Sequence, residues 1–327
     1  MLAYIIKRIL QFIPVFIGVT LILFFFRAVI PGDPIRMIAG EKAIPDDIYQ
    51  QMVSANHLDE PIYVQYGYYM NDLLHGDLGT SYQRKTPVID IFAEKFPYTA
   101  RLALCAITVE VVIGIAAGVI SAVRRYSFLD ALVTISTSVL VSMPVFWLGM
   151  LLQLFFGLFL KDVTGGAFSL PISGAGGVVS DYPVWMHYIL PAITLASVSL
   201  AYTARIMRSQ LLEVMNADYI RTARAKGLSR SAVIMKHAMK NAMIPVITFI
   251  GIDFGVMMSG AILTETIFNW PGIGFEIFRA IGQRDWPIVM GGVILVVLVI
   301  MMINLIIDIS YALFDPRIRY GKKAGVK

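Results

Sequence analysis

Two carboxylic acids, Glu110 and Asp253, stand inside long apolar stretches of this sequence. Because an ionised side chain is costly inside a bilayer, acids in such positions are candidates for function. They could line a path for a charged molecule, or they could hydrogen-bond to Ser, Thr or Asn residues on neighbouring helices. A third acid, Asp308, follows the last apolar stretch. We expect it at the membrane surface, in an ion pair with a basic residue.

The sequence contains none of the motifs that would supply catalysis or nucleotide binding. The phosphate loop G-x-x-x-x-G-K-[ST], the zinc motif H-E-x-x-H and the nucleophile elbow G-x-S-x-G are all missing. The four histidines are scattered, and the single cysteine, Cys105, cannot form an internal disulfide or a cysteine metal cluster. We therefore expect neither enzyme activity nor a bound metal or cofactor in this chain.

The composition is that of a membrane protein. Hydrophobic residues make up 57% of the 327 residues, charged residues only 15%, and the mean hydropathy is +0.73. Soluble domains carry about 25% charged residues, so a large soluble enzyme is excluded, and a disordered chain would need low hydrophobicity and high charge. The net charge of +5 is ambiguous by itself, because nucleic acids and membrane lipids both attract cations.

Six apolar stretches are long enough to cross a bilayer, which takes roughly 20 residues in a helix. The third stretch, 131–160, has no charge and no polar turn, so we expect one long helix there. The first stretch is too long for a signal peptide and lacks an A-x-A-like cleavage site. The expected spans are 9–30, 102–123, 131–160, 184–204, 242–264 and 286–307.

The distribution of Lys and Arg predicts the orientation, because basic residues concentrate on the cytoplasmic side. With both termini inside, the inner segments hold 17 basic and 4 acidic residues, against 10 and 15 outside. The outer segment 31–97 contains two helix-like stretches, 46–54 and 63–74, and is expected to form a small ordered cap. The outer loop 162–183 is rich in glycine and is expected to form turns.

The inner loop 205–241 is long and basic. We expect a short helix at 219–226, ended by Gly227, and a second helix at 230–241 that is capped by Ser229 and leads into the fifth span. Pro245 is expected to bend that span. The resulting helix–glycine–helix elbow is either a basic surface that touches anionic lipid or a docking site for a cytoplasmic partner.

This loop resembles the coupling loop of binding-protein-dependent ABC importer permeases, whose general signature is E-A-A-x-x-x-G followed by I-x-L-P. Counted back from Gly227, the three leading positions are Arg221, Thr222 and Ala223, so two of the three differ from that signature, and the spacing to Pro245 is longer. The sequence YIRTARAKGL followed by H-A-x-x-N-A-x-x-P is similar instead to the variant of the dipeptide and oligopeptide branch.

Six further blocks, which begin at residue 31 and end at residue 321, resemble the same branch. They are PGDP at 31–34, LDEPIYVQY at 58–66, HGDLGTSY at 75–82, PVFWLG at 144–149, ETIFNWPGIG at 265–274 and DPRIRYG at 315–321.

The resemblance implies an all-α membrane protein with the permease core of a type I ABC importer, an extra N-terminal helix and an outer cap. The corresponding parts are the helix 1–30, the segment 31–97, the core 98–316 with a coupling loop at 209–241, and a basic tail 317–327. It also implies that the loop contacts an ATPase. The coupling residues would be Arg221, Thr222, Ala223, Arg224, Ala225, Lys226, Gly227 and Ser229.

The implied partners are a second permease subunit, two ATPase subunits that bind ATP and Mg²⁺, an extracytoplasmic substrate-binding protein and membrane lipid, but no nucleic acid. The implied location is the plasma (inner) membrane of a bacterium or archaeon, with both termini in the cytoplasm. The cargo would be a dipeptide or oligopeptide, whose amine terminus Glu110 and Asp253 could meet in the path. Import of nickel or glutathione by the same machinery is the alternative. Ion-driven secondary transport and a membrane scaffold or receptor are alternatives of other classes.

Overall fold

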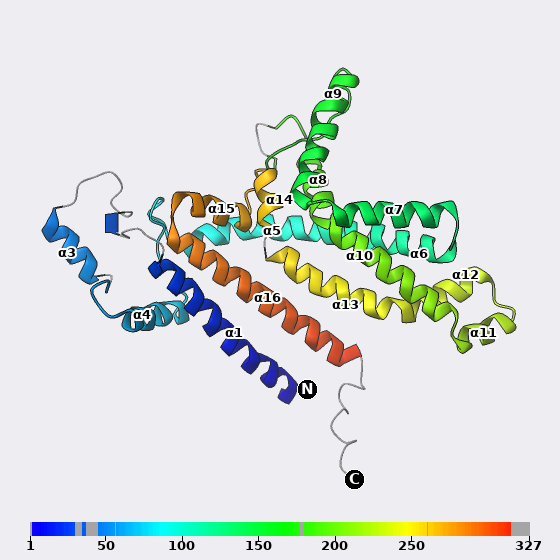
Figure 1. Cartoon of the computed structure of the whole chain (residues 1–327), viewed down its shortest axis with the longest axis horizontal. Coiled ribbons are helices and arrows are strands. Elements are labelled where there is room, and N and C mark those ends of the chain that lie inside the picture. The colour runs from blue at the N-terminus through cyan, green and yellow to red at the C-terminus, as the bar shows by residue number, and fades with distance from the viewer. Residues whose placement is uncertain are drawn as a thin grey trace, which may run out of the picture. The chain divides into compact units, whose positions relative to one another are not determined.

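The computed structural model describes residues 2–29, 35–36, 45–55, 57–176, 180–259 and 261–314, and its regular elements there are helices (Figure 1). The PGDP and DPRIRYG blocks and the tail 317–327 lie outside these residues. Within the described part, six helices are long and apolar enough to cross a membrane, which confirms the expected number. They are Ile5–Arg27, Val88–Val123, Val145–Val163, Val184–Met215, Arg230–Met258 and Trp286–Ile309.

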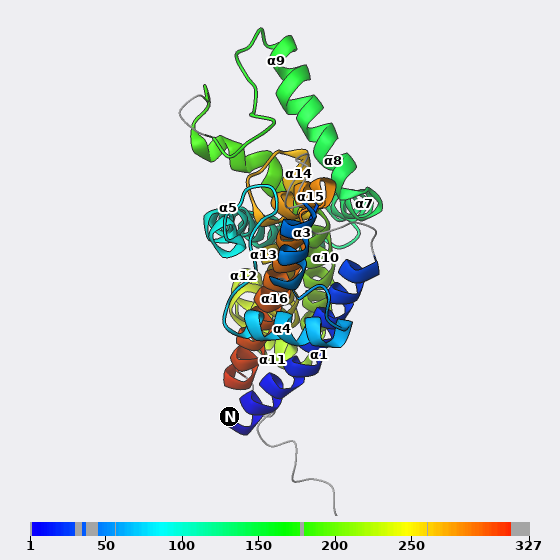
Figure 2. The ribbon, with the colours of Figure 1, turned by 90° about the vertical axis from the view of Figure 1, so that its left-hand side faces the viewer.

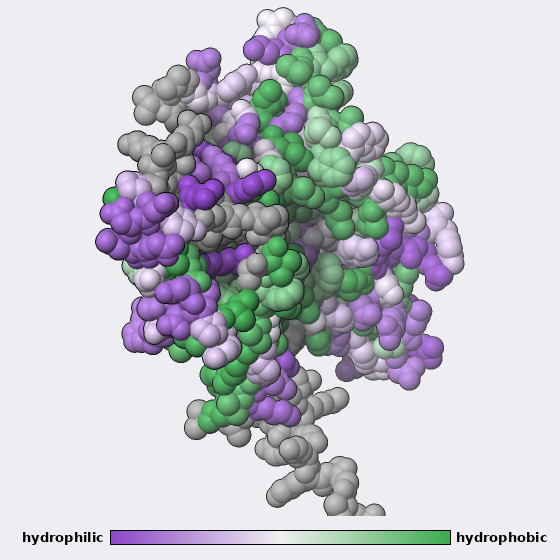
Figure 3. Space-filling model, turned by 60° about the vertical axis from the view of Figure 1, so that its left-hand side comes forward, coloured by the Kyte–Doolittle hydropathy of each residue, from purple (hydrophilic) through white to green (hydrophobic). Residues whose placement is uncertain are grey.

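The chain divides into two compact units, of which the first combines residues 1–97 with 272–327. Its core contains Val88, Phe92, Ile277 and Ile288, and Arg8 Nη2 lies 3.0 Å from Asp308 Oδ1, which confirms the expected ion pair. The α3 and α4 helices confirm the two helices expected in the outer segment; they are largely polar in Figure 3, whereas α1 is apolar. The helices of this unit are α1 (Leu2–Val29), α3 (Asp46–Ala55), α4 (Ile62–Leu74), the beginning of α5 (Val88–Val109), α15 (Ile273–Gln283) and α16 (Trp286–Phe314).

The second unit, residues 98–271, is built around α10 (Ile189–Met215), which packs against α6, α7, α8 and α13. Glycine permits close packing of α6 against α10, since a Cβ atom at Gly118 would lie 2.6 Å from the carbonyl oxygen of Ala204. The other elements are the end of α5, η1 (Glu110–Gly114), α6 (Ile115–Val123), α7 (Phe128–Ser142), α8 (Val145–Leu152), η2 (Gln153–Phe159), α9 (Leu160–Val163), η3 (Val184–Tyr188), α11 (Asp218–Ala225), α12 (Arg230–Ala232), η4 (Val233–Ala238), α13 (Met239–Met258) and α14 (Ile262–Ile267).

The expectation of one long helix at 131–160 is wrong. The α7 helix ends at Ser142, Met143 and Pro144 are extended with ψ angles of 133° and 132°, and α8 begins at Val145. The two parts run in different directions (Figures 1 and 2). Proline disfavours helical geometry in the residue before it and has no N–H to donate. A proline, rather than a polar turn, therefore breaks this apolar stretch.

Three of the long helices contain π-helical segments, at η1, η2 and η4. Such segments interrupt the i to i−4 hydrogen-bonding pattern and are frequent at functional sites. One of them begins at Glu110, and another directly follows the N-terminal turn of the helix after Gly227.

Candidate coupling elbow and intramembrane carboxylates

The elbow, defined here as residues 216–229 between α10 and α12, has the expected local structure. The α11 helix ends at Ala225, and Gly227 has a φ of +77°, a conformation that glycine adopts without strain. The Ser229 side chain accepts a hydrogen bond of 3.3 Å from the backbone N–H of Ala232, which confirms the predicted N-cap. The chain then stays helical from Arg230 to Met258, through Pro245.

One side of the elbow packs inward. Ile220 and Ala223 are buried in a cluster with Leu211, Val233 and Ala238. The Asn241 amide donates to the Tyr219 hydroxyl of the elbow at 2.8 Å. Directly after the elbow, Arg230 Nη2 donates to the Val123 carbonyl oxygen at 2.9 Å. Specific packing contacts and hydrogen bonds therefore fix the elbow to the rest of the second unit.

The other side of the elbow is exposed. Of the predicted coupling residues, all except Ala223 are exposed: Arg221, Thr222, Arg224, Ala225, Lys226, Gly227 and Ser229. The small size of Ala223 serves the packing of α11, because this side chain faces inward. Arg221 pairs with Asp218 at 3.1 Å, but both side chains remain largely in solvent.

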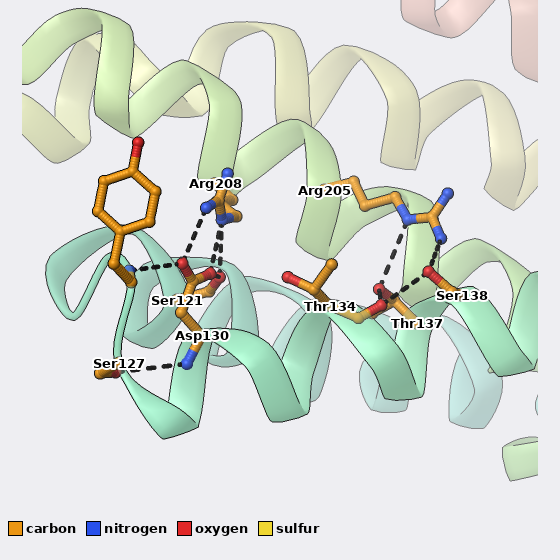
Figure 4. A network of polar contacts seen from close by, with 9 residues as sticks. Ser121, Ser127, Asp130, Thr134, Thr137, Ser138, Arg205 and Arg208 are labelled. Atoms are coloured by element: carbon orange, nitrogen blue, oxygen red, sulfur yellow. Dashed lines mark hydrogen bonds and ion pairs between the residues drawn. The ribbon is translucent and has the colours of Figure 1, made fainter.

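A partly buried ion pair, which sequence reasoning missed, joins the first turn of α7 to α10 (Figure 4). Arg208 donates to Asp130 through Nε at 2.8 Å and Nη2 at 2.9 Å. Ser121 also donates to this carboxylate, and the N–H of Tyr126 does so at 2.9 Å. These hydrogen bonds, above all those from Arg208, hold the pKa of the Asp130 carboxyl well below its usual value. We call Ser121, Asp130 and Arg208 the clasp.

The intramembrane acids Glu110 and Asp253 come together on different helices. Glu110 is fully buried, and Thr203 Oγ1 donates to its Oε1 atom at 2.6 Å. The Asp253 carboxyl group is an electrostatic neighbour of the Glu110 carboxyl group. Their Oε2 and Oδ2 atoms are buried without a hydrogen-bond partner among the described residues. The hydrogen bond from Thr203 agrees with one of the two alternatives for Glu110, bonding between helices, and leaves the other, a role in the path, open. The sequence did not indicate that the two acids are neighbours.

No group of three His, Cys, Asp or Glu side chains that could hold a metal ion occurs in the described part of the chain. The features that remain as candidates for function are the exposed side of the elbow, the clasp, and the acids Glu110 and Asp253.

Known proteins resemble the chain over nearly its whole length. It is 41% identical over 341 residues to the dipeptide transport system permease protein DppB of Escherichia coli K12, covering 98% of this chain and 100% of that protein. It is 42% identical over 337 residues to DppB of Alkalihalophilus pseudofirmus, with the same coverage. It is 40% identical over 324 residues to the glutathione transport system permease protein GsiC of Escherichia coli O6:H1, again with that coverage.

Two family models also match. Residues 1–103 match the N-terminal model of membrane components of binding-protein-dependent transport systems. Residues 114–320, which include the elbow, match the model of the inner-membrane component itself. The chain therefore belongs to the family of inner-membrane components of binding-protein-dependent transport systems.

Proposed function

We propose that this chain imports dipeptides or oligopeptides as the permease subunit of an ATP-driven transporter. As a member of its family it is a multi-pass inner-membrane protein and a translocation component rather than an enzyme, and it works with a binding protein and an ATPase. The peptide cargo is proposed because full-length relatives at 41% and 42% identity are dipeptide permeases. The exposed, conformationally defined elbow is the observation that carries the coupling role.

In this proposal the complex contains a second permease subunit and two ATPase subunits, which bind ATP and Mg²⁺. Both termini lie in the cytoplasm, so the elbow faces the ATPase. This arrangement is supported by the excess of basic residues in the segments that would be inside. Arg224 and Lys226 are exposed at the elbow, where they can meet acidic residues of the ATPase.

The elbow would act as a lever. ATP binding by the partner moves α11, and the motion passes to α10 and to the helix that starts at Arg230, because the elbow joins these two elements. The cavity then changes from inward-facing to outward-facing and receives the peptide from the binding protein. Hydrolysis and product release reset the elbow.

Substitution of Gly227 tests the coupling role. No atom lies within 4 Å of a Cβ built at this position, so a side chain would disturb the positive φ rather than the packing. Gly227→Val should leave binding of the binding protein intact and abolish peptide-stimulated ATP hydrolysis in the purified complex. Gly227→Asn is the matched control, since asparagine tolerates the left-handed conformation, and it should keep most of the stimulation. Equal stimulation in both variants and the wild type would refute the coupling role.

We further propose that Glu110 and Asp253 influence the path of the charged cargo. The support is the full burial of Glu110 and, in each acid, one buried oxygen atom without a hydrogen-bond partner among the described residues. Glu110→Gln and Asp253→Asn should alter uptake rates across a series of peptides of different charge. If selectivity and rate both stay at the wild-type level, the two acids only join helices.

Glutathione is the second candidate cargo, because the relative GsiC is a glutathione permease. Uptake into proteoliposomes that contain all subunits separates the possibilities. ATP-dependent uptake of dipeptides supports the proposal, and ATP-dependent uptake of glutathione alone supports the second candidate. Uptake driven by an ion gradient without the ATPase would indicate a secondary transporter.

A further inference from the structure

Arg205 of α10 differs from its neighbour Arg208 in its partners. Arg208 is held by the Asp130 carboxylate. Arg205 donates from Nη2 to the Ser138 hydroxyl at 3.0 Å and makes a longer contact of 3.5 Å from Nε to the Thr137 hydroxyl. Within the described residues no carboxylate pairs with Arg205, and its side chain is exposed.

A cavity of about 280 Å³ opens between α7 and α10 at this point. Both arginines line it, together with the hydroxyl-bearing Thr134, Thr137 and Ser138. Figure 4 shows Thr134 between the two guanidinium groups along α7. The hydroxyl groups of Thr137 and Ser138 donate to the Thr134 carbonyl oxygen, whereas the Thr134 hydroxyl makes no hydrogen bond to a described residue.

The charges in this cavity do not balance. Two guanidinium groups face one carboxylate, that of Asp130, so one positive charge is left over. Arginine and hydroxyl groups are the donors that recognise carboxylate and phosphate oxygens. The cavity therefore fits an oxyanion.

The surroundings of the cavity favour water over lipid. Arg205 lies in the part of the helix Val184–Met215 that the proposed topology assigns to the inner side, and a charged side chain there faces water or a bundle interior rather than lipid chains. Thr134 and Ser138 are exposed on the side of α7 that lines the cavity. With about 100° per residue, the opposite side of α7 carries the exposed apolar residues Phe128, Leu132, Ile135 and Val139.

We propose that Arg205, with the hydroxyl group of Thr134, binds the carboxylate of the peptide as it passes through the permease. This inference rests on the proposed function as a peptide importer. The volume is below the 300–1,000 Å³ of pockets that enclose a whole small molecule, so the cavity holds one end of the peptide. A lipid phosphate has the same oxyanion chemistry and is the competing source of the ligand.

The first test compares uptake by proteoliposomes that contain the complete transporter. Arg205→Gln should lower dipeptide uptake per ATP hydrolysed about tenfold, since hydrogen bonds to charged groups are among the stronger ones, and Arg205→Lys should restore part of it. Arg125→Gln, an exposed arginine that does not line the cavity, is the control and should match the wild type. Wild-type uptake by Arg205→Gln would overturn the proposal.

A second pair of variants keeps the test valid if Arg205→Gln does not fold. Thr134→Val removes a hydroxyl without a described partner and should lower uptake several-fold, whereas Thr134→Ser keeps the hydroxyl and should not. Equal uptake by these two variants would also overturn the proposal. Failure of the proposed function would look different, because the wild-type complex itself would then take up no peptide.

Labelling distinguishes the two sources of the oxyanion. In a Cys105→Ala background, Val133→Cys, which lines the cavity and leaves Arg205 in place, should react with a charged, membrane-impermeant thiol reagent, and free-acid dipeptide delivered by the binding protein should slow the reaction. Labelling that ignores the peptide but slows when phosphatidylglycerol replaces phosphatidylcholine would assign the site to lipid and overturn the proposal.

Discussion

The elbow and the clasp each contain an Asp–Arg pair, in opposite surroundings. In the elbow, Asp218 and Arg221 lie 3.1 Å apart with side-chain exposures of 93% and 74%. In the clasp, Asp130 and Arg208 lie 2.8 Å apart with side-chain exposures of 7% and 31%. The Ser121 hydroxyl and the Tyr126 N–H also donate hydrogen bonds to the Asp130 carboxylate. Exposed pairs contribute little to stability, whereas the loss of one member of a buried pair is costly. The comparison separates an exposed pair on a surface that is free to meet a partner from a largely enclosed pair that joins α7 to α10.

Asp130→Ala should have the largest effect, because it leaves the Arg208 guanidinium without its anion in a mostly buried site. We expect a loss of about 3 kcal/mol in the free energy of unfolding, measured by thermal or denaturant unfolding in detergent. Asp130→Ala combined with Arg208→Met should recover part of the loss. A change below about 0.5 kcal/mol would show that the clasp behaves like a surface pair.

Acid should have the second-largest effect, because it weakens the clasp. Because the folded state lowers the pKa of Asp130, the ionised carboxyl stabilises the fold above the unfolded pKa of about 4. This contribution is lost as the pH falls further toward the folded pKa. The melting temperature of the wild type should therefore drop more between pH 5 and pH 3 than that of Asp130→Asn, which cannot titrate. If the melting temperatures of the two proteins fell equally with pH, Asp130 would not be the titrating group that stabilises the fold.

Ser229→Ala should have a smaller and local effect. The loss of the N-cap should cost about 1 kcal/mol, seen as faster hydrogen exchange of the backbone amides that follow Ser229. Ser229→Asp keeps an acceptor at this position and should preserve the slow exchange. Unchanged exchange in Ser229→Ala would mean that the contacts of Arg230 and Asn241 fix this helix start without the cap.

Asp218→Ala should have the smallest effect. The exposed pair with Arg221 is expected to contribute about 0.3 kcal/mol, and salt should reduce even that. Unfolding measured at low and high ionic strength checks this. A loss as large as that of Asp130→Ala would abolish the distinction between the two regions.

The elbow was predictable from sequence because its signals are local. A glycine ends one helix and a serine caps the next a few residues later, so short-range chemistry determines both. The clasp was not predictable, because Asp130 and Arg208 are 78 residues apart and nothing in either segment indicates the pairing. The proximity of Glu110 and Asp253 was missed for the same reason. The helix break at Pro144 does have a signal in the sequence, which is the proline itself. The absence of a polar turn is the weaker indicator.

The π-helical segments change which residues share one face of a membrane-spanning helix. Each accommodates an extra residue in a helix that otherwise advances 100° per residue, so a helical wheel drawn before Glu110 is out of phase after Gly114. Removal of one residue within 110–114 would restore a regular α-helix, whereas a deletion elsewhere in that span would rotate every following side chain. The segment is thus a place where the length of this membrane helix can change by a single codon during evolution.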